Sequence, residues 1–212
     1  KDMTISLGSF GISLAELVRG FAVFPNGGKR IPLKSVLSIK DRNGKTYTPP
    51  IYKPVEGALP VVETVPPTVE GEAPKTIGNP FHTQLKENQV YDERLAYIMT
   101  NLMNGVVLYG TGSAAASVSR NLGGKTGTTS SFVDALFVGF SQNLVVGAWT
   151  GFDDNRTLGY GESGTRAALP MWVDFMYSAV GKYGAPEFNV PNGITQVMIN
   201  KQTGRPTPAG QG

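Results

Sequence analysis

The run of residues 124–129, which reads GKTGTT, is the part of the sequence best suited to chemistry. A lysine on a strand that leads into Thr-Gly-Thr places one ammonium and two hydroxyl groups in a small space. Gly127 carries no side chain, so a ligand can lie against the backbone there. Exposed N–H groups of such a strand can bind an oxyanion. The run suits a carboxylate substrate that reacts through a tetrahedral intermediate. An exposed edge strand with a solvated lysine and no function would have the same sequence pattern.

Other kinds of site are excluded by residue type. A phosphate-binding P-loop needs a glycine five residues before Gly124, and Ser119 stands there. The chain has no cysteine, which excludes thiol nucleophiles, zinc–thiolate sites, iron–sulfur clusters and disulfides. Its one histidine, His82, is expected in a surface loop, and the pair Asp153-Asp154 in a turn. We therefore expect neither a metal nor another cofactor.

The composition describes a folded, mildly basic chain. Its 212 residues are 40% hydrophobic and 17% charged, which excludes a disordered protein. The 19 lysine and arginine residues are scattered along the chain and the net charge is only +3, so a nucleic-acid partner is not expected. No apolar run reaches the 18 residues of a membrane span. Because the chain opens at Lys1 without a methionine or a leader, we expect a piece of a longer polypeptide whose anchor lies elsewhere.

Three strand-like runs surround the lysine motif, over residues 124–130, 135–141 and 144–152. Only Gln142-Asn143 links the last two, so they are predicted to pair antiparallel. Both are almost continuously apolar, which predicts burial on both faces in the middle of a layered sheet. Trp149 on the last strand is expected in the core.

Helices are predicted on either side of these strands. Residues 13–24 begin with a capping box formed by Ser13 and Glu16. Further helices are expected over 92–108, over 114–120 and from Pro170, which is favoured in a first turn. Their predicted buried faces are Leu14, Leu17, Val18, Phe21 and Phe24; Leu95, Ile98, Met99, Leu102, Met103 and Val106; and Met171, Trp172, Phe175, Met176 and Ala179.

The remaining segments are expected to be short or irregular. A hairpin is predicted within 31–51 around Asn43-Gly44. The proline-rich stretch 49–80 is expected to be an irregular excursion. Residues 1–190 then form one domain. Residues 191–212 add a short strand over 194–199, a turn over 200–204 and a tail. The total is an α+β fold with an antiparallel sheet layered between helices.

Several segments in order resemble the second half of the transpeptidase domain of class A penicillin-binding proteins, the bifunctional peptidoglycan synthases of bacterial cell walls. Lys-Thr-Gly is the third of three motifs in that family. The matching segments are 7–28 with its Asn-Gly-Gly turn, 104–115 with its Gly-Thr-Gly, 124–129, 134–140, 151–154 and 168–172. The resemblance implies the fold shared by penicillin-binding proteins and serine β-lactamases, incomplete in this chain.

The resemblance also implies roles for residues 124–129. Lys125 would be catalytic, setting the electrostatics for proton transfer, and would help bind the substrate carboxylate. The Thr126 and Thr128 hydroxyls would bind that carboxylate beside Gly127, and the Thr128 backbone N–H would be half of the oxyanion hole. Thr129 would line the same edge. Three nearby residues, Glu162, Ser163 and Arg166, are candidates for the border of the cleft.

The chain departs from the family pattern because the Ser-x-x-Lys nucleophile motif is absent. No lysine has a serine three residues before it; the nearest approach is Thr83-Gln84-Leu85-Lys86. Ser119-Arg120-Asn121 fits Ser-x-Asn, but it lies too close to Lys125 to be the second motif. The reactive serine, its lysine partner and the second oxyanion donor are therefore expected from the N-terminal half of the same domain.

The function implied is that of a peptidoglycan DD-transpeptidase, which transfers an acyl group from D-Ala-D-Ala stem peptides to an amine and is acylated by β-lactams. Stem peptides and β-lactams would be the ligands, and the site would lie outside the cytoplasm. Two alternatives stay open: a noncatalytic β-lactam or peptidoglycan sensor, and a serine β-lactamase or DD-carboxypeptidase. A Ser-x-x-Lys upstream would favour the enzyme.

Overall fold

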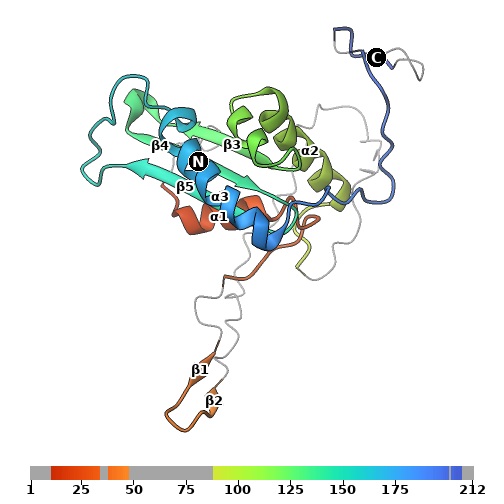
Figure 1. Cartoon of the computed structure of the whole chain (residues 1–212). Helices are drawn as coiled ribbons and strands as arrows, with labels where there is room; N and C mark the ends of the chain where they lie inside the picture. Colours follow the sequence, from red (N-terminus) through yellow and green to blue (C-terminus); the bar gives the residue numbers. More distant parts are fainter. Residues whose placement is uncertain (1–10, 34–37, 48–87, 201, 207–212) are drawn as a thin grey trace, which may run out of the picture. The chain divides into compact units, whose positions relative to one another are not determined.

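The computed structural model describes residues 11–33, 38–47, 88–200 and 202–206. The chain divides into two compact units, one within Pro32–His82 and one formed by the residues on both sides of it (Figure 1). The proline-rich stretch 49–80 and His82 lie outside the described residues. No helix in the described part has both the length and the apolar character that a membrane span requires.

The smaller unit contains the predicted hairpin. Strands β1 (Ile39–Lys40) and β2 (Thr46–Tyr47) pair antiparallel. The Asp41 carboxylate accepts the backbone N–H groups of Asn43 and Lys45, at 2.8 and 2.9 Å, which closes the turn. The Asn-Gly signal is therefore confirmed.

The larger unit is built on a three-stranded antiparallel sheet. Its strands are β3 (Gly123–Thr128), β4 (Asp134–Phe140) and β5 (Val145–Gly151), in the order β3-β4-β5. Each lies within two residues of its predicted range. Ser141 N–H donates to Leu144 O at 2.8 Å and closes the β4–β5 hairpin. The predicted antiparallel sheet is confirmed, with β3 at one edge.

Helix α1 (Leu14–Ala22) packs on β5. Ser13 caps it as predicted, because Glu16 N–H donates to Ser13 Oγ at 3.2 Å and the Glu16 carboxylate accepts from Ser13. Those bonds from Ser13 lower the pKa of Glu16. The helix approaches closely because Gly147 on β5 lacks a side chain: a Cβ there would lie 2.6 Å from Val18 Cγ2.

Helix α3 (Leu169–Tyr183) packs on the other face. Trp172 is fully buried, its indole N–H donates to Val146 O at 3.0 Å, and its ring meets that of Phe137 edge-on at 4.9 Å. A Cβ at Gly139 would lie 2.6 Å from this indole, so glycine is required there too.

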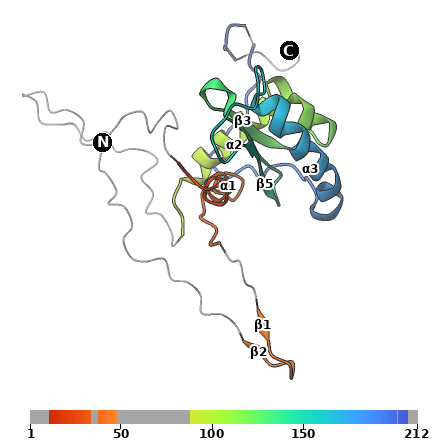
Figure 2. The same ribbon diagram turned by 90° about the vertical axis from the view of Figure 1, so that its left-hand side faces the viewer.

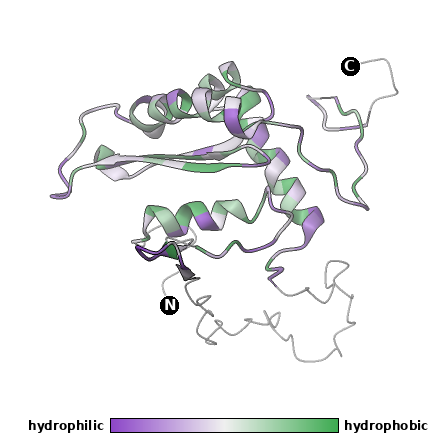
Figure 3. Ribbon diagram, turned by 60° about the horizontal axis from the view of Figure 1, so that its bottom comes forward, coloured by the Kyte–Doolittle hydropathy of each residue, from purple (hydrophilic) through white to green (hydrophobic). Residues whose placement is uncertain are grey.

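The two helices lie on opposite faces of the sheet. Gly147 pairs with Val138, whereas Trp172 covers the adjacent Gly139, and adjacent strand residues point to opposite faces. Figures 2 and 3 show helices on both sides of the strands. The layered α+β architecture predicted from the sequence is confirmed.

Helix α2 (Glu93–Tyr109) lies beside β3, and the short 3-10 helix η2 (Ser113–Ser117) packs against α2 and α3. The Asn104 amide donates to the carbonyls of Arg120 and Leu122, both at 2.7 Å, and so ties α2 to the segment that enters β3. The segment predicted as a helix over 114–120 is this shorter 3-10 turn.

Of the six residues predicted for the buried face of α2, only Met103 is buried. The residues that are buried are Ala96, Thr100, Met103 and Val107. Ile98 and Leu102 are 44% and 61% exposed. The buried side is thus rotated toward Ala96, Thr100 and Val107, and hydropathy alone does not distinguish these residues from the larger apolar ones beside them.

Three further expectations about burial are wrong. Trp149 is 42% exposed, and β5 is half-buried along its length instead of covered on both faces. On α3, Met171 and Phe175 are exposed, while Trp172, Met176 and Ala179 are buried as predicted. Helix α1 and helix α3 cover only part of β5, which leaves the indole at the surface.

The C-terminal residues form a turn and no continuous strand. Ile199 pairs with Pro206 as an isolated bridge, and the predicted strand over 194–199 is otherwise absent from the described residues. Gly204 N–H donates to Asn200 O at 2.8 Å, which confirms the turn.

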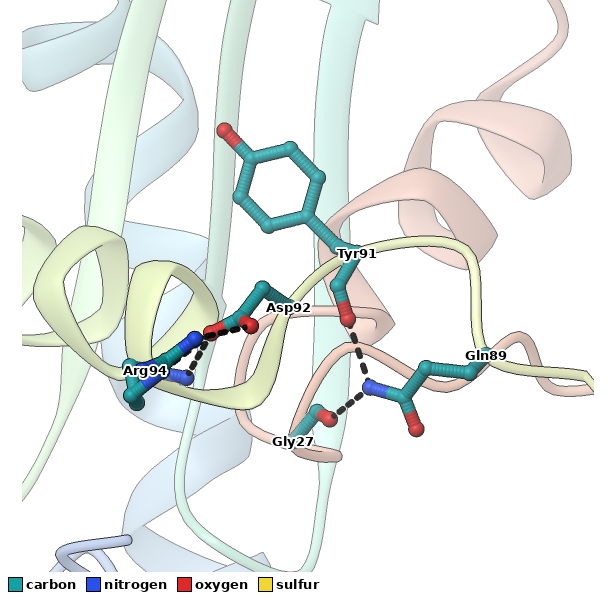
Figure 4. Close-up of polar contacts among 5 residues, drawn as sticks. All are labelled: Gly27, Gln89, Tyr91, Asp92 and Arg94. Atoms are coloured by element: carbon teal, nitrogen blue, oxygen red, sulfur yellow. Dashed lines mark hydrogen bonds and ion pairs between the residues drawn. The ribbon is translucent and has the colours of Figure 1, made fainter. Parts of the chain in front are cut away.

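The Asn-Gly-Gly turn after α1 docks on the segment that leads into α2 (Figure 4). The Gln89 amide donates to the carbonyls of Gly27 and Tyr91. Gly28 has φ +83°, and its carbonyl accepts the N–H groups of Val90 and Tyr91 at 2.9 and 3.1 Å. An added Cβ at Gly28 would collide with the Tyr91 carbonyl oxygen. Both the dihedral angle and the space require glycine.

Asp92 caps α2 and pairs with Arg94 (Figure 4). Its carboxylate accepts Arg94 N–H at 2.9 Å and the guanidinium at 2.8 and 3.0 Å. The side chain of Asp92 is 7% exposed. The hydrogen bonds from Arg94 lower the pKa of Asp92 from 3.8 to about 2.

Gly28→Ala should destabilise the protein by about 2 kcal/mol or more, because it combines an unfavourable φ with a backbone clash. Gly20→Ala is the matched control: a Cβ at this α1 position meets nothing within 4 Å. It should be neutral or slightly stabilising. Thermal unfolding of the full-length protein measures both. Equal melting temperatures for the two variants would contradict the role assigned to Gly28.

Asp92→Asn should lower the free energy of unfolding by about 2 kcal/mol at neutral pH, since asparagine caps a helix but cannot form the ion pair. The folded pKa is depressed, so this contribution is complete above the unfolded value of 3.8 and is lost as the pH falls through about 2. The difference from wild type should therefore shrink in acid. Amide hydrogen exchange in the first turn of α2 measures it. Asp174→Asn is the charge-matched control, because Asp174 is exposed on the outer side of α3. A difference between Asp92→Asn and wild type that does not change with pH would contradict the role assigned to Asp92.

Candidate functional site at the β3 edge

The hydrogen-bonding groups of β3 are divided between its two sides. Thr129 N–H donates to Asp134 O at 3.0 Å and thus faces β4. Since the direction alternates along a strand, the N–H and C=O groups of Thr126 and Thr128 face away from β4. In the described sheet that side of β3 is the free edge. The backbone N–H of Thr128, predicted to be half of an oxyanion hole, therefore points away from β4.

Lys125 is exposed, and its ammonium folds back toward this edge. Nζ donates to Thr126 O at 2.9 Å and approaches Thr126 Oγ1 at 3.4 Å. The cation therefore lies at the strand edge beside the threonine hydroxyl. An ammonium at this place favours an anionic ligand.

The Thr126 and Thr128 side chains share one face of β3, because they are two residues apart. Thr126 Oγ1 lies 3.0 Å from Thr111 Oγ1, and Thr128 Oγ1 accepts the N–H of Gly164 at 3.0 Å. Thr165 Oγ1 donates to Thr111 O at 3.4 Å and links the two supporting segments. Lys125 and both hydroxyls are thus brought together from the predicted motif.

Gly164 begins the π-helical turn η4 (Gly164–Ala168) and lies directly on the strand backbone. A Cβ there would be 2.5 Å from Gly127 O and 2.4 Å from Leu136 O, so no other residue fits. Gly164 and Thr111 are site neighbours that the sequence did not predict. Their positions inside Gly-rich segments were visible, but only the tertiary structure brings them to β3.

Gly127 is a different case from Gly164. A Cβ at Gly127 would make ordinary contacts with Leu136, at 3.4 and 3.7 Å. Packing within the described residues therefore does not require glycine at 127. A ligand lying against the strand would provide a reason for it.

Thr129 belongs to the turn that follows β3. Its hydroxyl accepts the N–H of Asp134 at 2.7 Å, and the Asp134 carboxylate accepts the indole N–H of Trp149 at 2.9 Å. Within this turn Ser131 and Phe132 have φ of +61° and +56°, in the left-handed region. Such strain persists only where the surroundings fix the backbone, here next to the motif.

The other residues considered for the cleft have mainly local contacts. Ser163 O accepts the N–H groups of Arg166 and Ala167, which starts η4, and the Arg166 guanidinium lies against Gly161.

The Asp154 carboxylate pairs with Arg156 in the expected turn. In the part of the chain that the structure describes, no group of three or more acidic or histidine side chains could hold a metal.

A hollow of about 290 Å³ lies at the opposite end of the sheet from Thr128. Its lining includes Gln142 in the β4–β5 turn, whereas Thr128 pairs with Ala135 at the start of β4. Its wall contains no residue of the Lys-Thr-Gly motif. The motif instead lies on an open strand edge, which is the arrangement expected of one side of a cleft.

Comparison with known families identifies the family of the chain that carries this strand edge. The model of the penicillin binding protein transpeptidase domain matches residues 1–157. The chain belongs to the penicillin-binding protein transpeptidase family. The resemblance seen in the sequence is therefore confirmed.

Several curated relatives are named Penicillin-binding protein 1A. The protein of Rickettsia conorii is 33% identical over 99% of this chain and 25% of its own length. That of Pseudomonas aeruginosa is 29% identical over 97% of the chain and 27% of its own length. The chain thus spans about a quarter of these relatives.

A solved penicillin-binding protein shares the fold. The crystal structure of Penicillin-Binding Protein 1A from Haemophilus influenzae matches with a TM-score of 0.74 and 29% identity, over 99% of this chain and 32% of that one. The transpeptidase fold predicted from the sequence, incomplete in this chain, is confirmed.

Proposed function

We propose that this chain forms the carboxylate-binding side of a serine DD-transpeptidase site whose nucleophile lies outside these 212 residues. The chain has the Lys-Thr-Gly strand of the family but no Ser-x-x-Lys. The relatives extend well beyond the matched segment, which leaves room for the missing motifs.

The observation that carries the proposal is the free edge of β3. Lys125 Nζ lies 2.9 Å from Thr126 O, and two threonine hydroxyls lie on one face of the strand. An ammonium 4 Å from a carboxylate contributes about 4 kcal/mol at an effective dielectric constant near 20. That is enough to select D-Ala-D-Ala ends, or the carboxylate of a β-lactam, over neutral peptides. Lys125, Thr126, Gly127 and Thr128 form this site, and Thr129 closes its end.

The proposed reaction is acyl transfer in two steps. A serine hydroxyl gives up its proton as its oxygen attacks the carbonyl of the penultimate D-Ala, and the resulting oxyanion accepts a hydrogen bond from Thr128 N–H. The C–N bond then breaks, the departing D-Ala amine takes a proton, and an acyl-enzyme ester remains. A stem-peptide amine then attacks that ester and loses a proton, a new C–N bond forms, the C–O ester bond breaks, and the serine oxygen takes up a proton. Lys125 assists by stabilising negative charge and setting the electrostatics of proton transfer.

The wider assignment rests on the family to which the chain belongs. Residues 1–190 would be the C-terminal part of the transpeptidase domain, and residues 191–212 would be a tail. The partner of this chain would be the N-terminal half of the same domain, which carries the serine. The whole protein would be a bifunctional glycosyltransferase and transpeptidase that acts on peptidoglycan outside the cytoplasm. Its anchor would lie in another segment.

Fluorescent penicillin should label the full-length protein on a peptide outside these 212 residues, because the reactive serine is placed there. Proteolysis followed by mass spectrometry of the adduct locates it. An adduct on a residue of this chain would contradict the missing-nucleophile argument. A full-length protein that binds but is never acylated would instead support the noncatalytic sensor.

Lys125→Ala in the full-length protein should slow penicillin acylation by about 10²-fold, as the loss of a charged site group does. Lys182→Ala, which removes an exposed ammonium from α3, is the matched control and should react at the wild-type rate. Stopped-flow or gel-based labelling measures both rates. A Lys125→Ala rate within twofold of wild type would remove Lys125 from the site.

A further inference from the structure

We infer that Thr111 and Gly164 are positioning residues that turn the Thr126 and Thr128 hydroxyls into hydrogen-bond donors toward the bound anion. The inference rests on the proposed function, because it concerns how the same site recognises a carboxylate. A carboxylate accepts hydrogen bonds and donates none, so a hydroxyl helps bind it only when its own proton points to the ligand. The residues behind β3 decide that direction.

Thr128 is the simpler case. A hydroxyl has one proton and two acceptor positions. Gly164 N–H, a donor that cannot reverse its role, occupies one acceptor position of Thr128 Oγ1 at 3.0 Å. The hydroxyl proton is thereby directed away from Gly164. Since Thr128 is exposed, the proton is available to a ligand at the edge.

Thr126 is oriented by two neighbours. The Lys125 ammonium, which can only donate, approaches Thr126 Oγ1 at 3.4 Å, and Thr111 Oγ1 lies at 3.0 Å. With Thr111 as the donor, both acceptor positions of Thr126 are filled and its proton turns to the edge. Thr165 holds the Thr111 backbone through the 3.4 Å bond to its carbonyl.

The close approach of η4 depends on glycine at 164. A side chain there would collide with the carbonyls of Gly127 and Leu136, which would move the Gly164 N–H away from Thr128. A π-helical turn at this point is consistent with a functional constraint, since such turns are rare and gather at functional sites. Two segments distant from the motif in sequence therefore determine its hydrogen-bond polarity.

The test compares acylation of the full-length protein by a penicillin and by its methyl ester, which lacks the anionic carboxylate. Thr111→Val should lower the acylation rate constant for the penicillin roughly threefold to tenfold, the value of one hydrogen bond. The ester should be affected much less, so the ratio of the two rate constants falls. Thr111→Ser should restore the ratio. Thr100→Val removes a hydroxyl that bonds within α2 and should leave the ratio unchanged.

A second variant tests Gly164 independently. Gly164→Ala should also lower the penicillin-to-ester ratio, whereas Gly181→Ala, at a site in α3 with nothing within 4 Å of the added Cβ, should not. If Gly164→Ala fails to fold, the Thr111 series still decides the matter, because Thr111 is exposed and valine has nearly the same shape as threonine.

Each outcome separates the inference from the proposed function. If wild type is not acylated, the proposed function fails. If wild type is acylated and Thr111→Val slows penicillin and ester equally, Thr111 has only a structural role and the inference is overturned. If Thr111→Val reacts faster with penicillin, Thr111 is an acceptor from Thr126, which also overturns it.

Discussion

The antiparallel pairing of β3 with β4 is the constraint on which the candidate site depends. Once Thr129 N–H is bonded to Asp134 O, alternation directs the backbone groups of Thr126 and Thr128 to the opposite side. A slip of one residue would reverse this and place the threonine side chains on the other face. The β3–β4 register, more than the residue types of the motif, therefore determines which backbone and side-chain groups a ligand can contact.

Glycine at close approaches keeps this register rigid. Gly147 and Gly139 let α1 and the Trp172 indole lie against opposite faces of the sheet, and Gly164 lets η4 rest on the β3–β4 backbone. The strand edge is thus supported from behind while its outer side stays open. This arrangement suits a preorganised site, in which donors need not move when the ligand arrives. The high glycine content of the chain has, at these positions, a packing explanation.

Much of the fold could be predicted because its signals are short-range. The Ser13 and Glu16 capping box, the Asn-Gly hairpin and the two-residue β4–β5 link are contacts between near neighbours, and each formed as expected. The family resemblance, carried by six ordered segments, identified the transpeptidase fold. What failed was the direction of larger side chains: hydropathy could not tell which face of α2 meets the sheet, or that Trp149 would be left partly exposed.

Residue types and their short-range spacing were enough to identify the chemistry available: a lysine and threonines on a strand, no cysteine, and no Ser-x-x-Lys. They were also enough to predict most of the local elements that hold these residues. Only the tertiary structure decided which distant residues touch that strand, namely Thr111 before it and Gly164 after it. The physical reason is that these contacts depend on chain crossings and on atom-scale space between backbones, and neither is encoded in the spacing of residue types along the chain.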